Sequence, residues 1–121
     1  MITFAPSKIF FMDNELNKLS KIQDIIANDA GLIAYFYSDN CAPCLSLRPK
    51  IKELLAKNYP KMNLYFINSE KYPEISAEFG IFSNPTLLVY FDRKEYLRKS
   101  KYISIPELSQ GIERLYNMMF E

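Results

Sequence analysis

The most regular apolar stretch of the chain covers residues 32–37 and predicts a buried central strand. It is apolar at both alternating sets of positions, which suits a strand covered by helices on both faces. A polar turn at residues 38–40 follows, and a helical pattern begins near Cys41. Pro49 lies inside this helix and is expected to kink it. The apolar positions of the predicted helix are Leu45, Leu47, Ile51, Leu54 and Leu55.

A second short apolar strand is predicted at residues 62–67, after a break at residues 59–61. Strand, helix and strand then form a crossover unit, in which the strands run parallel and the connection is right-handed. Residues 73–79 predict a short helix ended by Gly80, because glycine commonly follows the last turn of a helix.

The C-terminal third predicts a hairpin and a final helix. Residues 86–91 and 96–103 flank the charged residues 92–95, a spacing typical of two antiparallel strands. Ser104 and Glu107 have the spacing of a capping box, which predicts that the chain ends in a helix. Three tyrosines of this region are expected to be half-buried packing residues rather than a partner surface: Tyr90, Tyr96 and Tyr102.

The N-terminal part is predicted less completely. Ser20 and Gln23 form a second capping-box pattern, which predicts the start of a helix. Residues 1–19 are treated as a separate segment that could add an edge strand, and residues 20–121 as the folded domain. The elements together predict one α/β domain, with a mixed central sheet of four or five strands flanked by helices.

Composition limits the function classes open to this chain of 121 residues. Fifteen basic and fourteen acidic residues give a net charge of +1, and the lysines form no stripe that could neutralise phosphates. The chain has no histidine, which excludes Ser/His and Cys/His nucleophile pairs, and its two cysteines are too few for a structural zinc site. We therefore expect no nucleic-acid partner and no metal.

Nothing in the sequence predicts a membrane or an export signal. The longest apolar stretch, residues 31–37, is far shorter than the roughly 20 residues that cross a bilayer. Residues 1–12 are mostly apolar, but Pro6 and Lys8 interrupt them, and no small-residue cleavage site follows a basic leader. We expect a cytoplasmic protein that does not bind membranes.

The candidate chemistry lies in Cys41, Ala42, Pro43 and Cys44, at the start of the first predicted helix. Two cysteines three residues apart there can close a disulfide, and the helix N-terminus favours their thiolates. Cys41, nearer the helix end, is the better nucleophile, whereas Cys44 would be more buried and would resolve a mixed disulfide. Pro43 suits the first turn and stiffens the ring. Inert core cysteines are the alternative, but a C-x-x-C motif between a strand and a helix favours redox chemistry.

The chain resembles the thioredoxin family over roughly residues 20–119. The resemblance rests on the apolar strand, the C-x-x-C motif, Pro49, residues 79–81 and the loop of Asn84, Pro85 and Thr86. It implies a thioredoxin-like fold and a cis-proline loop at Pro85 beside the dithiol. It also implies that the backbone of Asn84 pairs with a substrate segment as a transient strand.

Four positions depart from the pattern of the family. Asn40 stands where the family usually has tryptophan, and Tyr35 where many members have a buried acid. Phe66 lies in the neighbourhood where a lysine is expected. Phe82 lies in the segment before the cis-proline, which differs from the corresponding segment of the family. The candidate proton carriers are therefore water, Tyr35 or Asp39, and partner choice is expected to differ from that of familiar members.

The leading functional hypothesis is a thiol-disulfide oxidoreductase that reduces protein disulfides through Cys41 and Cys44. It needs no bound cofactor, and the resemblance implies electrons from an upstream disulfide reductase. A monomer is expected. Two alternatives remain: an interaction module with a vestigial dithiol, whose partner binds around residues 82–85, and an exported disulfide oxidant or isomerase.

Overall fold

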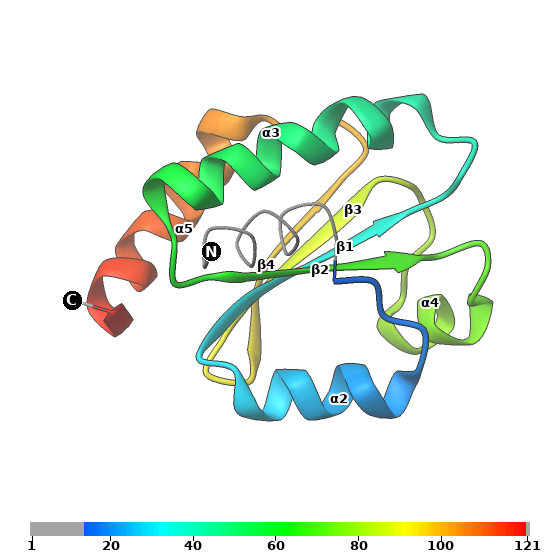
Figure 1. The fold of residues 1–121 in the computed structure, drawn as a ribbon, viewed down its shortest axis with the longest axis horizontal. Helices are drawn as coiled ribbons and strands as arrows, with labels where there is room; N and C mark the ends of the chain where they lie inside the picture. The colour runs from blue at the N-terminus through cyan, green and yellow to red at the C-terminus, as the bar shows by residue number, and fades with distance from the viewer. Residues whose placement is uncertain (1–13, 121) are drawn as a thin grey trace, which may run out of the picture.

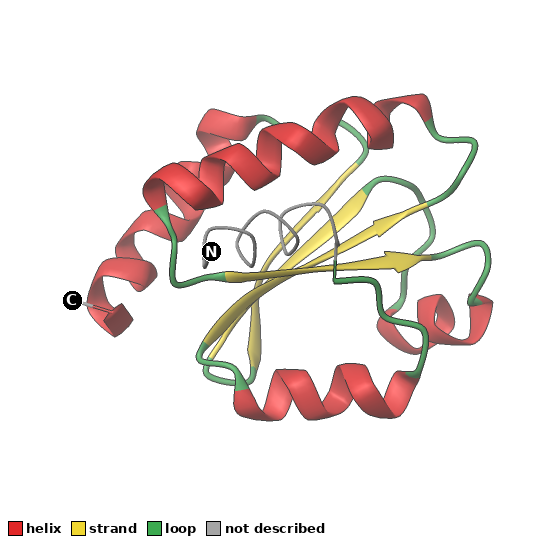
Figure 2. Cartoon of the chain, in the orientation of Figure 1, coloured by secondary structure: helices red, strands yellow, loops and turns green. Residues whose placement is uncertain are grey.

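The computed structural model describes residues 14–120, which form a mixed sheet between two pairs of helices (Figures 1 and 2). In these residues the sheet has four strands in the order β2-β1-β3-β4. The strands are β1 (Gly31–Tyr37), β2 (Asn63–Asn68), β3 (Thr86–Phe91) and β4 (Lys94–Ser100). β1 and β2 are parallel, whereas β3 is antiparallel to both of its neighbours. The predicted α/β architecture with a mixed sheet is confirmed.

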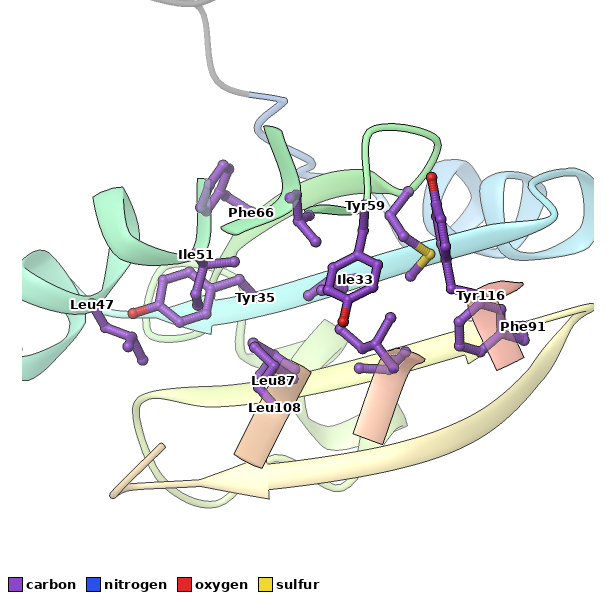
Figure 3. Packing of buried hydrophobic residues seen from close by; sticks show 14 residues of the cluster. Ile33, Tyr35, Leu47, Ile51, Tyr59, Phe66, Leu87, Phe91, Leu108 and Tyr116 are labelled. Carbon is purple, nitrogen blue, oxygen red and sulfur yellow. The ribbon is translucent and has the colours of Figure 1, made fainter. Parts of the chain in front are cut away.

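The four helices of the described residues cover both faces of the sheet. α3 (Ala42–Asn58) and α5 (Ile105–Phe120) lie on one face, and α2 (Leu19–Asn28) and α4 (Pro73–Phe79) on the other (Figure 1). Alternate residues of β1 pack on the two faces of the sheet. Ile33 and Tyr35 belong to the core under α3 and α5 (Figure 3), whereas Phe36 belongs to the core on the opposite face. Burial on both faces explains why this strand has no polar position.

The helix that carries the dithiol follows the predicted pattern except at one position. Its buried side chains recur at intervals of three or four residues, at Cys44, Leu47, Ile51 and Leu55. Leu45 is 61% exposed, so the prediction that it supplies a core position is wrong. It follows Cys44 directly and therefore points about 100° away around the helix axis.

The hairpin is tighter than predicted. β4 begins at Lys94 and ends at Ser100, and the turn contains only Asp92 and Arg93. Both turn residues have positive φ, 51° and 69°, and a two-residue turn of this kind matches the twist of antiparallel strands. The predicted four-residue turn and the predicted strand over residues 96–103 are therefore wrong in their bounds. The turn can be this short because its two residues adopt a conformation usually found in glycine.

Of the two predicted capping boxes, the one before α2 is wrong and the serine cap of the one before α5 is confirmed. α2 begins one residue before Ser20, with Lys18 at the N-cap position and no side-chain capping bond, so that capping box is wrong. At α5 the Glu107 N–H donates to Ser104 Oγ at 3.3 Å, which confirms Ser104 as the cap. α4 ends at Phe79, and Gly80 follows it with a left-handed φ of 67°, as predicted.

Part of the N-terminal segment lies along the outer edge of β2. The Leu16 N–H donates to the Phe66 carbonyl and the Phe66 N–H to the Asn14 carbonyl, both at 2.8 Å. This is one isolated parallel bridge between Glu15 and Phe66 and not a strand. Residues 1–13 lie outside the described residues, and the proposed boundary after residue 19 stays a prediction. None of the helices over residues 14–120 is long and apolar enough to cross a membrane.

Candidate functional site

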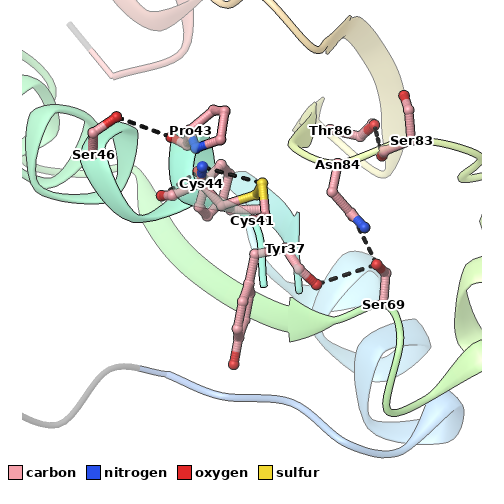
Figure 4. The surroundings of a disulfide bond; sticks show 10 residues. Tyr37, Cys41, Pro43, Cys44, Ser46, Ser69, Ser83, Asn84 and Thr86 are labelled. Carbon is pink, nitrogen blue, oxygen red and sulfur yellow. Dashed lines mark hydrogen bonds between the residues drawn. A yellow bond between two sulfur atoms is a disulfide. The ribbon is translucent and has the colours of Figure 1, made fainter. Parts of the chain in front are cut away.

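The two cysteines meet where β1 gives way to α3. They form a disulfide with a Cα–Cα distance of 5.2 Å (Figure 4). Cys41 is the N-cap residue of α3, and the Cys44 N–H donates to its sulfur at 3.2 Å. Pro43 lies in the first turn of the helix, as predicted. The pair therefore stands at a helix N-terminus, where unpaired N–H groups favour a thiolate once the disulfide is reduced.

The two sulfur-bearing residues differ in accessibility. Cys44 is 1% exposed and belongs to the buried residues, whereas Cys41 is partly exposed. Asn40, Ala42 and Pro43 around it are all exposed. A substrate can therefore reach the sulfur of Cys41 more readily than that of Cys44. This difference suits Cys41 as the attacking cysteine and Cys44 as the resolving cysteine.

The loop before β3 lies opposite the disulfide (Figure 4). The peptide bond between Asn84 and Pro85 is cis, as the resemblance implies. Thr86 Oγ1 donates to the Ser83 carbonyl at 2.7 Å, which holds the loop closed on itself. Phe82, at the outer end of the loop, is 93% exposed. The backbone role of Asn84 toward a substrate stays a prediction.

Two polar residues that the sequence analysis did not single out, Asn68 and Ser69, connect the site loops. The Ser69 N–H donates to the Tyr37 carbonyl at 2.7 Å, and its hydroxyl lies 2.7 Å from Asn84 Oδ1. Asn68 Nδ2 donates to Asp39 Oδ1 at 3.1 Å. Both residues lie just beyond the strand predicted over residues 62–67, and no role was predicted for them. The available signal was their place at the carboxyl end of β2, which adjoins the end of its parallel neighbour β1.

Tyr35 lies beneath the dithiol and is fully buried. Its hydroxyl donates to the Cys44 carbonyl at 2.8 Å, and its ring packs edge-on against Phe66 with centroids 5.7 Å apart. Burial raises the pKa of Tyr35 to about 12. A phenol with this pKa keeps its proton at neutral pH, so Tyr35 is not a proton acceptor there. It fixes the first turn of α3 instead.

Arg48, one turn beyond Cys44, joins the site to the N-terminal segment. Its guanidinium carbon lies 3.8 Å from the centroid of the Phe66 ring and 4.8 Å from that of Tyr37, which are cation–π distances. Arg48 also forms an ion pair with Glu15, and the Tyr37 hydroxyl donates to Glu15 Oε1 at 2.7 Å. Residues 14–16 are thus held against both β2 and α3.

We expect Tyr35→Phe to destabilise the fold without changing how activity depends on pH. Removing the hydroxyl leaves the buried Cys44 carbonyl without this donor, which costs about 1–3 kcal/mol of unfolding free energy. Because the phenol stays protonated, the pH profile of disulfide reduction between about pH 6 and pH 9 is expected to keep its shape.

Urea unfolding at several pH values tests the same variant. The pKa of Tyr35 is higher in the folded chain, about 12 against an ordinary 10.0, so the unfolded chain ionises first and stability is lost as pH rises from 10 toward 12. Tyr35→Phe lacks this contribution and should lose less stability over that interval than the wild type. A shifted activity profile near neutral pH would instead identify Tyr35 as a proton carrier.

Comparison with known proteins places this arrangement in one family. The family model for thioredoxin matches residues 14–114. The thioredoxin-like protein YdfQ of Bacillus subtilis is 26% identical over 103 residues, which cover 85% of this chain and 91% of YdfQ. Thioredoxin from Pyropia yezoensis is 31% identical over 68 residues, 56% of this chain and 64% of its own length.

Solved structures share the fold. Mitochondrial thioredoxin 3 of Saccharomyces cerevisiae in its oxidised form is similar with a TM-score of 0.74 and 22% identity, covering 84% of this chain and 93% of that chain. Thioredoxin of Plasmodium falciparum has a TM-score of 0.74 and 24% identity, over 84% of this chain and 97% of that chain. With the Cys41–Cys44 pair at disulfide distance, the general activity is thiol-disulfide exchange. The family match over most of the chain shows that this protein belongs to the thioredoxin family.

Proposed function

We propose that the protein reduces disulfide bonds in other proteins, with Cys41 as the attacking and Cys44 as the resolving cysteine. The observation that carries this proposal is the unequal exposure of the pair. Cys41 is partly exposed and its side chain caps a helix, whereas Cys44, joined to it by the disulfide, is buried. One sulfur can meet a protein substrate while the other is kept for the second step.

The proposed reaction consists of two successive thiol-disulfide exchanges. The Cys41 thiolate attacks one sulfur of the substrate disulfide, an S–S bond forms between the two proteins, and the other substrate sulfur leaves as a thiolate that takes a proton from water. Cys44 then loses its proton to water, and its thiolate attacks the sulfur of Cys41. The second substrate thiolate leaves, and the protein retains the disulfide. Two electrons have passed to the substrate.

The surrounding residues hold the reacting sulfurs in place. The hydrogen bond from Tyr35 to the Cys44 carbonyl fixes the backbone that carries the resolving sulfur. The Cys44 N–H, 3.2 Å from the Cys41 sulfur, stabilises the negative charge of the Cys41 thiolate before it attacks the substrate. Because Tyr35 stays protonated, it does not take the proton that Cys44 loses, and the proposal assigns that step to solvent water.

The proposal includes a cellular setting. The protein works as a monomer in the cytoplasm, where an upstream disulfide reductase returns Cys41 and Cys44 to the dithiol. A reducing compartment supports this direction of exchange. The charge balance of +1 supports a protein partner rather than a nucleic acid.

Insulin reduction by dithiothreitol tests the proposal. We expect the wild type to accelerate precipitation of the insulin B chain well above dithiothreitol alone, and a Cys41→Ser/Cys44→Ser variant to give the rate of dithiothreitol alone. Equal rates for the two proteins would contradict it. The interaction-module alternative predicts instead that the double variant keeps its biological activity, and an oxidant would speed disulfide formation in reduced substrates more than their reduction.

A further inference from the structure

A groove of about 370 Å³ opens beside the dithiol, on the side of the cis-proline loop. Its volume lies in the range of small-molecule pockets, about 300–1,000 Å³. One wall comes from α3, and the other from the segment that follows β4 and from Pro85. The described residues that line it are Pro43, Ser46, Leu47, Lys50, Pro85, Lys101, Tyr102, Ile103 and Ser104.

Lys101 is held at the Pro85 side of the groove by its backbone. Its N–H donates to the Pro85 carbonyl at 2.8 Å, which places residue 101 directly beside the cis-proline. The residue has a φ of 63°, a left-handed conformation in which glycine is the usual residue. A lysine here exposes a positive charge where the loop meets the groove.

Lys50 supplies the opposite wall. It lies two helical turns after Pro43 on the same face of α3, and both residues line the groove. Lys50 is exposed, and none of the ion pairs among residues 14–120 involves Lys50 or Lys101. The neighbouring carboxylate of Glu53 pairs with Lys57 at 2.8 Å. The two charges of the groove are therefore not neutralised within the described part of the chain.

The groove combines this positive charge with exposed apolar surface. Tyr102 is 96% exposed, so the prediction that it packs half-buried is wrong. Its segment turns away from the sheet after β4 ends at Ser100, which removes residue 102 from any strand neighbour. Among the described lining residues there are two lysines and no carboxylate.

We propose that the groove selects substrate proteins whose target cysteine is flanked by acidic residues. This inference rests on the proposed function, since the occupant is the segment that carries the attacked disulfide. An extended segment crossing Pro85 would place its Asp or Glu side chains toward Lys50 on one wall and Lys101 on the other. The selectivity comes from charge complementarity and is separate from the exchange reaction itself.

Two disulfide-linked peptides of equal length test the proposal. One carries Glu on both sides of the cysteine, and the other carries Gln at the same positions. At low ionic strength we expect the wild type to show a kcat/KM roughly 25-fold higher for the Glu peptide, from about fivefold for each lysine. Raising the salt concentration to about 1 M, where charges are screened within about 3 Å, should reduce this ratio toward one.

Matched variants test whether Lys50 and Lys101 cause the preference for the Glu peptide. In Lys50→Gln/Lys101→Gln the Glu-to-Gln ratio should fall to about one, since each pair contributes on the order of 1 kcal/mol in water. Lys21→Gln removes an exposed charge from α2, on the other face of the sheet, and should keep the ratio of the wild type. A wild-type ratio of one, or a ratio unchanged in the double variant, would overturn the proposal. Failure of the wild type to reduce either peptide would instead overturn the proposed function.

Discussion

Cys44→Ser is expected to turn the protein into a trap that stays bound to its substrates through a disulfide at Cys41. Without the second sulfur, no internal attack can release the mixed disulfide, so turnover falls to that of the external reductant alone. Cys41→Ser should form almost no such adduct, because the remaining sulfur is 1% exposed. The measurement is a non-reducing gel of each variant mixed with a disulfide substrate, followed by mass spectrometry of the shifted band.

The matched pair of variants separates the roles of the two cysteines. Both substitutions remove one sulfur and keep a side chain of similar size, so a difference between them reports position in the fold. Dithiothreitol should release the adduct of Cys44→Ser completely. Equal trapping by both variants, or trapping by Cys41→Ser alone, would contradict the assignment of Cys41 as the attacking residue.

Phe66→Ala is expected to lower the free energy of unfolding by about 3–5 kcal/mol, the usual cost of removing a buried aromatic ring. Phe66 is 1% exposed and its ring packs edge-on against Tyr35. The guanidinium of Arg48 stacks on the same ring. The substitution therefore opens a cavity beside Tyr35 and removes one of the two rings that hold Arg48 in place.

Urea denaturation followed by circular dichroism measures this effect. Phe82→Ala is the matched control, because the same ring is removed from a side chain that is 93% exposed; its stability should stay within about 0.5 kcal/mol of the wild type. A loss below about 1 kcal/mol in Phe66→Ala would show that the site collapses around the missing ring. Phe66 would then not be needed to hold the ring of Tyr35 in place.

Tyr35 and Phe66 show how a departure from the family pattern is accommodated. Both positions were recognised from the sequence as unusual, one for a missing acid and one for a missing lysine. In the structure the two side chains pack against each other, and Tyr35 satisfies the Cys44 carbonyl. The ionisable groups expected beside the second cysteine are replaced by an aromatic pair whose one hydroxyl stays neutral.

Local patterns determined much of the fold and the location of the site. The run of apolar residues in β1, the glycine after α4 and the serine before α5 each have a local physical cause: burial on both faces, a left-handed φ and an unpaired N–H. The spacing of Cys41 and Cys44 at the start of a helix likewise predicted the dithiol, because one helical turn brings the two side chains together.

Only the tertiary structure decided which segments distant in sequence surround that dithiol. Ser69 connects the ends of β1 and β2 to the loop of Asn84, and Lys101 is held beside Pro85 by a backbone hydrogen bond. No sequence pattern specifies these contacts, since they depend on the strand order β2-β1-β3-β4 and on the tight turn before β4. The sequence thus determined the reaction type through local geometry, whereas the surface that meets a substrate emerged only when the sheet brought its loops together.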